Sequence, residues 1–467
     1  MIRTGETICA PATSGGGAIA VIRISGLQSF DICGKIFYPS ETRIKLEEQK
    51  GYSIIHGEIR SGEEIIDEVL VSVFRSPHSY TGEDSIEISC HASGFIQQKI
   101  LGLLILHGAV MAMPGEFTQR AFLNGKMDLS QAEAVADLIA AESGKAHRIA
   151  ISQIRGSFSD EISMLRADLL HFASLIELEL DFGEEDVEFA DRTELKEIVL
   201  KVLAVSRGLS SSFSLGNAIK KGVPVTITGA PNTGKSTLLN LLLQEEKAIV
   251  SEIPGTTRDF IEDSVIIDGV QYRFIDTAGL RRSGDVIENL GIKKTYEKIE
   301  QASVILLVAD IMEGLLSLLR ILAEIRNEIT GKGKKLVILI NKTDTDSGQK
   351  RKEIEGRIDL AENETMLFIS AKTGMGIDDL KVALGRLTGT DQLLSESVII
   401  SNIRHYEALV KVTESLERVL SGLEEKIPED LIAIDVRQAI HYLGEITGEI
   451  TTDEILGNIF KNFCIGK

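Results

Sequence analysis

The spacing of hydrophobic positions changes three times along this chain. Over the first 117 residues, short alternating or continuous apolar runs are separated by turn-forming residues, which is typical of β-strands. We expect strands at 7–10, 18–24, 52–59, 65–74 and 86–90, and a helix at 94–107. The first two strands flank Ser14-Gly15-Gly16-Gly17, which favours a hairpin turn. Residues 1–117 are therefore predicted to form an α+β domain.

From residue 118 the apolar positions recur every three or four residues, which indicates amphipathic helices. These helices are expected at 117–124, 130–144, 145–180, 194–215, 402–423, 435–447 and 452–460. Asp128 or Ser130 can cap the second of them. Between 218 and 387 strands and helices alternate, which is typical of a parallel sheet. We therefore predict an all-α domain in two pieces, 118–217 and 388–467, with an α/β domain at 218–387 inserted between them.

One glycine loop in the inserted domain carries the clearest chemistry. Residues 229–237 read Gly-Ala-Pro-Asn-Thr-Gly-Lys-Ser-Thr, after the apolar run 223–228 and before the helical run 238–243. This is the GxxxxGK[ST] spacing of a phosphate-binding loop between a strand and a helix. Lys235 would place a cation on the outer phosphates, and the Ser236 hydroxyl would bind Mg²⁺. The alternative is a glycine turn without a ligand, and the flanking strand and helix argue against it.

Three further motifs follow expected strands at 272–275, 336–340 and 366–369, where open α/β sheets bind ligands. They are Asp276-Thr277-Ala278-Gly279, Asn341-Lys342-Thr343-Asp344 and Ser370-Ala371-Lys372. The Asp344 carboxylate can accept hydrogen bonds from N1–H and the 2-amino group of guanine, which adenine cannot supply. The four motifs together predict a GTP site. The expected GTP-binding residues are Asn232, Thr233, Gly234, Lys235, Ser236, Thr237, Ser251, Glu252, Ile253, Pro254, Gly255, Thr256, Thr257, Asp276, Thr277, Ala278, Gly279, Asn341, Lys342, Asp344, Ser370, Ala371 and Lys372.

Two positions depart from the pattern of many small GTPases. Leu280 stands where a water-orienting glutamine often follows the Asp-x-x-Gly turn, so another group must orient the water. The candidates for that role are Arg281, Arg282, Asp285 and Glu288. The amide oxygen of Asn232 either ligates a monovalent cation beside the phosphates or stabilises the loop, and the residues leave both interpretations open. The segment 251–259 is the expected switch, in which a threonine hydroxyl joins the Mg²⁺ ligands.

Composition sets the outer bounds of the function. A formal charge of −20 over 467 residues argues against broad nucleic-acid binding but leaves room for a local basic patch. The apolar run 100–113 contains His107 and is too short to span a bilayer, so we expect no membrane segment. Cys9, Cys33, Cys90 and Cys464 have neither metal-ligand nor disulfide spacing, which indicates a cytoplasmic protein. The acidic run 181–191 is expected to be a solvated loop rather than a cation site. Near the C-terminus, the Cys464 thiol is either a nucleophile or a small buried hydrophobe.

Several motifs together resemble the MnmE (TrmE) family of tRNA-modification GTPases. They are Gly255-Thr256-Thr257-Arg258-Asp259, Asp276–Gly279, Pro114-Gly115-Glu116-Phe117-Thr118, residues 124–129 and the terminal Cys464-Ile465-Gly466-Lys467. The resemblance runs from Thr7 to Lys467. It implies an N-terminal domain related to folate-binding aminomethyltransferases, a homodimer formed through these domains, and a flavoprotein partner, MnmG. It also implies that the pair installs a (carboxymethyl)aminomethyl group on C5 of the wobble uridine, U34, of certain tRNAs. The one-carbon donor would be a folate of the 5-formyltetrahydrofolate type.

The same resemblance assigns roles to individual residues. It gives K⁺ to Asn232, Ser251, the carbonyl of Ile253 and Thr256, and it gives Mg²⁺ to Ser236 and Thr257. The implied catalytic residues are Lys235, Glu288 (which orients the attacking water) and Cys464 (a proposed thiol). The implied folate-binding residues are Arg23, Glu87, Lys126 and Lys467. Pro254 and the turn 13–16 depart from the family pattern.

Two other functions compete with this one. A ribosome-assembly or other RNA-associated regulatory GTPase shares the Pro-Gly-Thr-Thr-Arg-Asp switch, here 254–259, but usually carries a Lys- and Arg-rich RNA-binding domain that this acidic chain lacks. A folate-dependent transferase that uses GTP only as a regulator is the second. A folate-binding test distinguishes them in part. A ribosome-assembly GTPase should not bind folate, whereas a folate-dependent transferase and a tRNA-modification GTPase of this family should.

Overall fold

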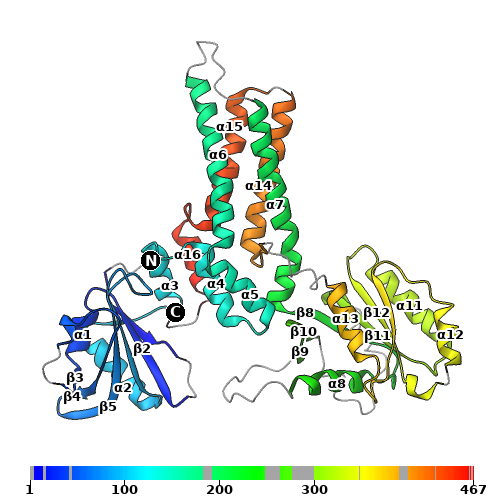
Figure 1. Cartoon of the computed structure of the whole chain (residues 1–467), viewed down its shortest axis with the longest axis horizontal. Helices are drawn as coiled ribbons and strands as arrows, with labels where there is room; N and C mark the ends of the chain where they lie inside the picture. The colour runs from blue at the N-terminus through cyan, green and yellow to red at the C-terminus, as the bar shows by residue number, and fades with distance from the viewer. Residues whose placement is uncertain are drawn as a thin grey trace. The chain divides into compact units, whose positions relative to one another are not determined.

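The computed structural model describes residues 5–13, 17–41, 45–181, 192–247, 263–275, 299–346, 348–388, 398–425, 427–461, 463 and 466. The chain divides into two compact units, whose elements Figure 1 labels. Unit 1 comprises Met1–Ala140, Ala150–Ser206 and Ala408–Lys467, and unit 2 comprises Ala141–Ile149 and Arg207–Glu407. The three domain boundaries predicted above do not coincide with these two units, and they stay predictions.

Unit 1 begins with a seven-stranded sheet in the order β3-β4-β5-β6-β2-β1-β7. The strands are β1 (Ile8–Pro11), β2 (Ile19–Ser25), β3 (Phe37–Pro39), β4 (Ser53–Ser61), β5 (Glu64–Phe74), β6 (Ser85–His91) and β7 (Val110–Met111). All neighbours are antiparallel except β1 and β7, which are parallel. The five expected strands are confirmed to within a few residues, and β1 pairs with β2 as a hairpin requires. Residues 14–16 of the expected turn lie outside the described residues.

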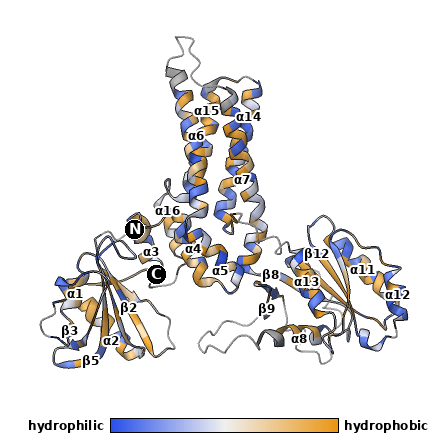
Figure 2. Ribbon diagram, in the orientation of Figure 1, coloured by the Kyte–Doolittle hydropathy of each residue, from blue (hydrophilic) through white to orange (hydrophobic). Residues whose placement is uncertain are grey.

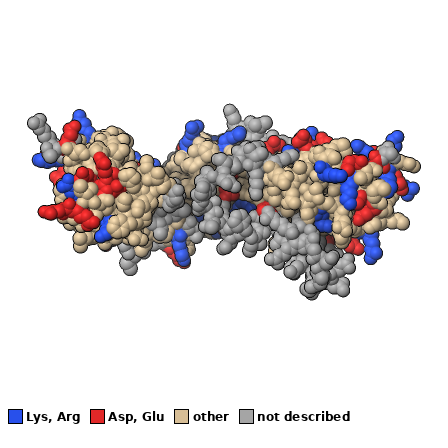
Figure 3. Space-filling model, turned by 90° about the horizontal axis from the view of Figure 1, so that it is seen from below, with Lys and Arg blue, Asp and Glu red and all other residues tan. Residues whose placement is uncertain are grey.

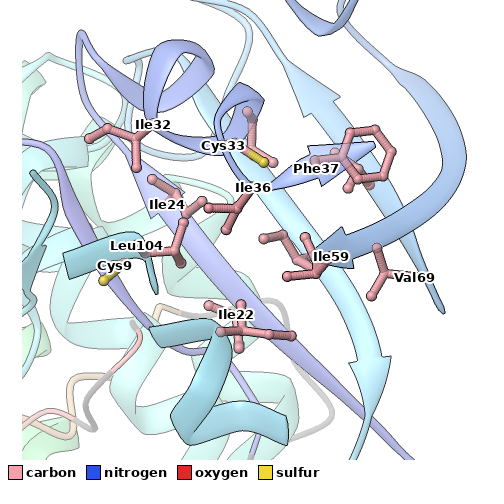
Figure 4. Packing of buried hydrophobic residues seen from close by; sticks show 14 of the residues in the cluster. Cys9, Ile22, Ile24, Ile32, Cys33, Ile36, Phe37, Ile59, Val69 and Leu104 are labelled. Atoms are coloured by element: carbon pink, nitrogen blue, oxygen red, sulfur yellow. The ribbon is translucent and has the colours of Figure 1, made fainter. Parts of the chain in front are cut away.

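One face of this sheet is covered by helices α1 (Ser29–Gly34) and α2 (Gly94–Leu106). Alternation along the strands sends Ile22 and Ile24 of β2 into the same apolar cluster as Leu104 of α2. Figure 4 shows Cys9 and Cys33 among these residues. Burial raises the pKa of the Cys33 thiol to about 12 and that of Cys9 to about 11, so both side chains pack as small hydrophobes.

The helical part of the chain carries both apolar and polar residues on each helix (Figure 2). It consists of α3 (Glu116–Leu123), α4 (Leu129–Ala140), α5 (Gly144–Ile154), α6 (Ser157–Asp181), α7 (Arg192–Lys221), α14 (Ile403–Glu425), α15 (Glu429–Thr447) and α16 (Asp453–Phe460). The single helix expected at 145–180 was wrong: it is α5 and α6, separated at Gly156, whose φ of +91° is incompatible with a continuous helix. Asp128 rather than Ser130 caps α4, because its Oδ1 accepts a hydrogen bond from the backbone N–H of Gln131.

Helix α7 is long and apolar enough over Leu195–Lys221 to cross a membrane by length and composition, a test that core helices of water-soluble proteins also pass. In unit 1 its Lys196 pairs with Glu424 of α14, and its Lys201 pairs with Asp168 of α6. Two ion pairs to neighbouring helices, together with the buried Val199 and Val202, give this helix a protein environment.

Unit 2 is built on a six-stranded sheet in the order β13-β12-β11-β8-β10-β9. The strands are β8 (Val223–Thr228), β9 (Asp263–Ile267), β10 (Val270–Phe274), β11 (Val304–Asp310), β12 (Lys335–Asn341) and β13 (Glu364–Phe368). All pairs are parallel except β9 with β10. The helices are α8 (Lys235–Lys247), α11 (Leu315–Ile329), α12 (Gln349–Glu355) and α13 (Ile377–Leu387). Both faces of the sheet are covered, because Leu306 and Val308 of β11 pack with α8 and α13 while Ile305 and Leu307 pack with α11. Because β8, β10, β11, β12 and β13 are parallel, the carboxyl ends of the four strands that precede the motifs (β8, β10, β12 and β13) lie at the same edge of the sheet, as predicted.

Candidate functional site

The glycine loop that follows β8 fits against the ends of two neighbouring strands. Gly229 has φ +142°, and a Cβ there would lie 2.0 Å from the carbonyl oxygen of Val308 in β11. Gly234 has φ +97°, and a Cβ there would lie 2.2 Å from Nδ2 of Asn341 in β12. Both glycines are thus required by the close approach of other backbone and side-chain atoms as well as by their left-handed conformation. The loop ends where α8 begins, at Lys235.

The ammonium group of Lys235 lies inside this loop. Its Nζ donates to the carbonyl oxygens of Gly229 (2.9 Å) and Ala230 (2.6 Å). Burial lowers the pKa of Lys235, and the negative charge of Glu313, after β11, opposes that effect. In these contacts the half-buried Lys235 ammonium is bound by neutral carbonyl oxygens. An anionic phosphate oxygen in the loop would form a stronger hydrogen bond with it. Thr233 stabilises the loop, because its Oγ1 donates to the carbonyl oxygen of Ala230 (2.9 Å).

Asn341 joins three of the predicted motifs. Its Nδ2 donates to the carbonyl oxygen of Thr233 in the glycine loop (2.7 Å), and its Oδ1 accepts from the backbone N–H of Ala371 (2.9 Å). Both groups of the amide are used, and the side chain is buried. Asn341 therefore holds the phosphate loop and the Ser370-Ala371-Lys372 loop together, a structural role that its sequence position alone did not reveal. A contact between Asn341 and the nucleotide stays a prediction.

Asp344 is positioned by the same neighbouring loop. The Ser370 hydroxyl donates to Asp344 Oδ1 (2.7 Å), which orients the carboxylate that is predicted to bind guanine. Lys342, at φ +64°, turns its Nζ to Asp310 Oδ2 (2.6 Å). Burial alone would raise the pKa of Asp310, but the hydrogen bonds from Lys342 and the backbone of Met312 lower it. Asp310 was missed by the sequence analysis, although its place at the carboxyl end of β11 could have revealed it.

The remaining described residues of the predicted GTP site follow the loop and strand ends. Asn232 is exposed at φ +61°, a conformation that asparagine tolerates well. Ser236 and Thr237 lie in the first turn of α8, and Lys372 is exposed directly after Ala371. The following predicted residues lie outside the described part of the chain: Ser251, Glu252, Ile253, Pro254, Gly255, Thr256, Thr257, Asp276, Thr277, Ala278, Gly279, Glu288, Cys464 and Lys467.

A second group of predicted residues gathers on the sheet of unit 1. Arg23 of β2 and Glu87 of β6 are register partners, and Arg23 Nη2 lies 2.8 Å from Glu87 Oε1. The Arg23 guanidinium lies over the rings of Tyr80 (5.3 Å) and Phe117 (5.5 Å). Burial raises the pKa of Tyr80, against the effects of Thr118 and Arg23.

The C-terminal tail reaches this pair. Arg23 Nη1 donates to the carbonyl oxygen of Gly466 (3.4 Å), and a Cβ on Gly466 would lie 2.0 Å from the carbonyl oxygen of Pro11 in β1. Lys126 Nζ donates to the carbonyl oxygen of Pro77 (2.9 Å), in the segment that leads to Tyr80. The structure thus brings Arg23, Glu87 and the end of the chain together, and places Lys126 against the connection between β5 and β6.

Comparison with known proteins gives matches along almost the whole chain. Residues 7–126 match the family model described as the GTP-binding protein TrmE N-terminus, and residues 129–464 match the MnmE helical domain. The chain is 52% identical over 466 residues to a protein of Flavobacterium psychrophilum named tRNA modification GTPase MnmE, and the match covers 99% of each chain. It is 50% identical over 464 residues to the protein of that name from Bacteroides fragilis, again with 99% of each chain covered. A third protein of that name, from Christiangramia forsetii, is 50% identical over 476 residues and is matched over its whole length.

Proposed function

Because this chain belongs to the family of tRNA modification GTPases MnmE, we propose that it couples K⁺-dependent GTP hydrolysis to modification of the wobble uridine U34. Membership makes it a GTP hydrolase that acts in tRNA modification. The flavoprotein MnmG is the proposed partner in that reaction. We propose that this protein acts in the cytoplasm. The observation that carries the GTP part is the loop of Gly229–Thr237, with Lys235 inside it and Asp344 fixed by Ser370 beside it.

The proposed metal ligands are oxygen atoms of the types that each ion prefers. Ser236 and Thr257 supply hydroxyls for Mg²⁺, a hard cation that selects oxygen ligands. Asn232, Ser251, Thr256 and the carbonyl of Ile253 supply neutral oxygens for K⁺. The exposed side chain of Asn232, on a loop turned by its left-handed backbone, supports this assignment. When bound, the two cations neutralise charge that develops on the phosphate oxygens.

The chain's own residues perform the rest of hydrolysis. Lys235 transfers its hydrogen bonds from the loop carbonyls to the outer phosphates and so holds them in place. The carboxylate of Glu288 orients a water for in-line attack on the last phosphate. In many small GTPases a glutamine at the position of Leu280 has this role.

Hydrolysis should depend on which monovalent salt is present. At equal ionic strength, we expect turnover about tenfold faster in KCl than in NaCl, because the smaller ion fits the same oxygens less well; tenfold corresponds to about 1.4 kcal/mol in the barrier. Steady-state release of phosphate from GTP with the full-length protein measures this. Choline chloride is the control for ionic strength alone. Equal rates in KCl and NaCl would contradict the role of K⁺ and leave the GTP site itself untouched.

The face of the unit 1 sheet opposite α1 and α2 is the proposed place of both folate binding and dimer formation. It carries Arg23 and Glu87, and Phe117 of α3 packs on Ile8 and Ala10 of β1 at one side of it. The same face exposes Ile19 (68%), Ile54 (69%) and Leu70 (46%). Exposed aliphatic side chains around an ion pair support a second copy of the chain covering this face. The guanidinium suits a folate carboxylate, and Glu87 suits the donors of the aminopyrimidine ring.

Removal of Arg23 should weaken folate binding. In Arg23→Ala the full-length protein is expected to bind 5-formyltetrahydrofolate about tenfold to a hundredfold more weakly, since a charge-assisted hydrogen bond contributes about 1.5–3 kcal/mol. Isothermal titration measures the affinity. Arg60→Ala is the matched control, because Arg60 also pairs with a glutamate (Glu58) and lies over a ring (Tyr38) in the same sheet. Equal losses in both variants, or none in Arg23→Ala, would contradict the assignment.

The RNA partner is proposed to be tRNA, as the names of the relatives indicate. On the face drawn in Figure 3, acidic and basic side chains are interspersed over the described residues of both units. This distribution supports binding of a defined RNA surface, together with a partner protein, over general attraction to nucleic acid.

A further inference from the structure

The hairpin of β9 and β10 is joined in sequence to both segments expected to sense the last phosphate. β9 begins at Asp263, directly after the residues 251–262 that include the predicted switch threonines. β10 ends at Phe274, two residues before the Asp276–Gly279 motif. If either segment moves on GTP binding or hydrolysis, the movement is passed through the chain to this hairpin.

The tip of the hairpin caps a helix. The carbonyl oxygen of Gly269 accepts a hydrogen bond from the backbone N–H of Lys145 (3.1 Å), at the start of α5. The first N–H groups of a helix have no partner within the helix, and Gly269 supplies an acceptor to one of them. Beside it, Gln271 Nε2 donates to Glu142 Oε2 (2.7 Å), just before α5 begins. Residues 141–149 and the hairpin belong to the same unit.

The other end of α5 is capped from a different helix. The carbonyl oxygen of Ile154, at the last residue of α5, accepts from Gln131 Nε2 of α4 (3.0 Å). Gln131 also accepts from the backbone N–H of Asp128 through its Oε1 (2.9 Å), and its own N–H donates to Asp128 Oδ1 (2.9 Å). Asp128 stands two residues after Lys126, whose Nζ holds the Pro77 carbonyl. One glutamine thus connects the end of α5 to the segment that carries a proposed folate-binding residue.

Both ends of α5 are therefore tied to functional segments by hydrogen bonds that satisfy helix termini. α5 has 11 residues, which at 1.5 Å per residue makes a rod about 16 Å long. A helix of this length transmits a displacement of its N-terminus to its C-terminus more readily than it stretches, since stretching breaks its internal hydrogen bonds. A shift of the hairpin must either move α5 or break the hydrogen bond between the Lys145 N–H and the Gly269 carbonyl oxygen.

We propose that Gln271 and Gln131 are positioning residues that couple the nucleotide state to the Lys126 segment through α5. Gln271, with Glu142, keeps the hairpin on the start of α5, and Gln131 passes the position of the end of α5 to Asp128. That this coupling reaches a folate site rests on the proposed role of Lys126 in folate binding. The connection from the hairpin through α5 to Asp128 does not depend on that role. Such a coupling is reciprocal, so a ligand that fixes the Lys126 segment also alters nucleotide affinity.

Amide hydrogen exchange of the full-length protein tests the link directly. Wild-type protein is compared in GDP and in a non-hydrolysable GTP analogue, both at saturation, and exchange rates are followed in peptides covering 124–131 and 144–154. We expect exchange rates in both peptides to differ at least about threefold between the two nucleotides. This corresponds to a fraction of a kcal/mol in the free energy of local opening. Gln271→Ala should abolish the difference in both peptides, and Gln131→Ala should abolish it in 124–131 only.

Two further variants keep the outcome decisive. Gln98→Ala removes the same side chain at an exposed site of α2 and should behave as wild type. Gln271→Glu places a second carboxylate against Glu142, so it should uncouple the peptides by repulsion even if Gln271→Ala unfolds. A wild-type protein whose 144–154 peptide ignores the nucleotide, or a folded Gln271 variant that retains the full difference, would overturn the proposal. Neither result depends on folate, MnmG or K⁺, so failure of the proposed function leaves this readout intact.

Discussion

The Lys235→Ala variant is expected to lose about 10²- to 10⁴-fold in kcat/KM for GTP, because two charge-assisted hydrogen bonds of about 1.5–3 kcal/mol each disappear and tenfold in rate corresponds to about 1.4 kcal/mol. In the described structure the Lys235 ammonium is held by the carbonyl oxygens of Gly229 and Ala230, at the centre of the loop. Its charge is the one that the loop offers to the outer phosphates. Single-turnover hydrolysis and nucleotide titration separate the loss in chemistry from the loss in binding.

Lys334 supplies an unusually well-matched control. Its Nζ also donates to two backbone carbonyls, those of Glu300 and Ala302, and burial also lowers its pKa. It precedes β12 at the opposite end of the sheet from the glycine loop, so it has no route to a phosphate. Lys334→Ala should lower thermal stability while kcat/KM for GTP stays within about twofold. Equal kinetic losses in the two variants would show that the loss in Lys235→Ala comes from lower protein stability and not from contact with the phosphates.

Much of the fold could be predicted because it depends on local patterns. β8 was predicted at its observed bounds, since a short apolar β-branched run ends in a glycine loop. The alternation of apolar residues in β4 and β5 likewise revealed two strands. By contrast β3 and β7 have three and two residues, and they are strands only because a neighbour supplies the hydrogen bonds. Such segments carry no pattern of their own.

The site was predicted as a set of motifs, whereas its internal connections were not. The hydrogen bond from Asn341 to Thr233 joins residues 108 positions apart, and that from Gln131 to Ile154 joins two helices. Hydrogen bonds of this kind follow from tertiary packing, which periodicity does not encode. The register that sets Arg23 opposite Glu87 is another example, because a shift of one strand by one residue would send one of the two side chains to the covered face. Their resemblance-based assignment to one site was therefore the only signal that linked them.

Asp344→Asn should change which base the protein binds. The carboxylate of Asp344 accepts from N1–H and the 2-amino group of guanine, and an asparagine amide can accept only one of these while its NH₂ opposes the other. Loss of one bond to a charged group plus an unpaired donor costs about 3–4 kcal/mol, so GTP affinity should fall about 10²- to 10³-fold. Xanthine carries an oxygen where guanine carries the amino group, and the asparagine NH₂ can donate to it. Affinity for xanthosine triphosphate should therefore rise as that for GTP falls.

Ser370→Ala distinguishes recognition by Asp344 from a general disturbance of the pocket. Ser370 only orients the carboxylate, through the 2.7 Å hydrogen bond to Asp344 Oδ1. Its loss should weaken GTP binding by about tenfold or less, and leave the preference for GTP over xanthosine triphosphate unchanged. Competition titrations with GTP, xanthosine triphosphate and ATP measure all three affinities in both variants. If Asp344→Asn weakens all three nucleotides equally, the carboxylate supports the loop and does not read the base.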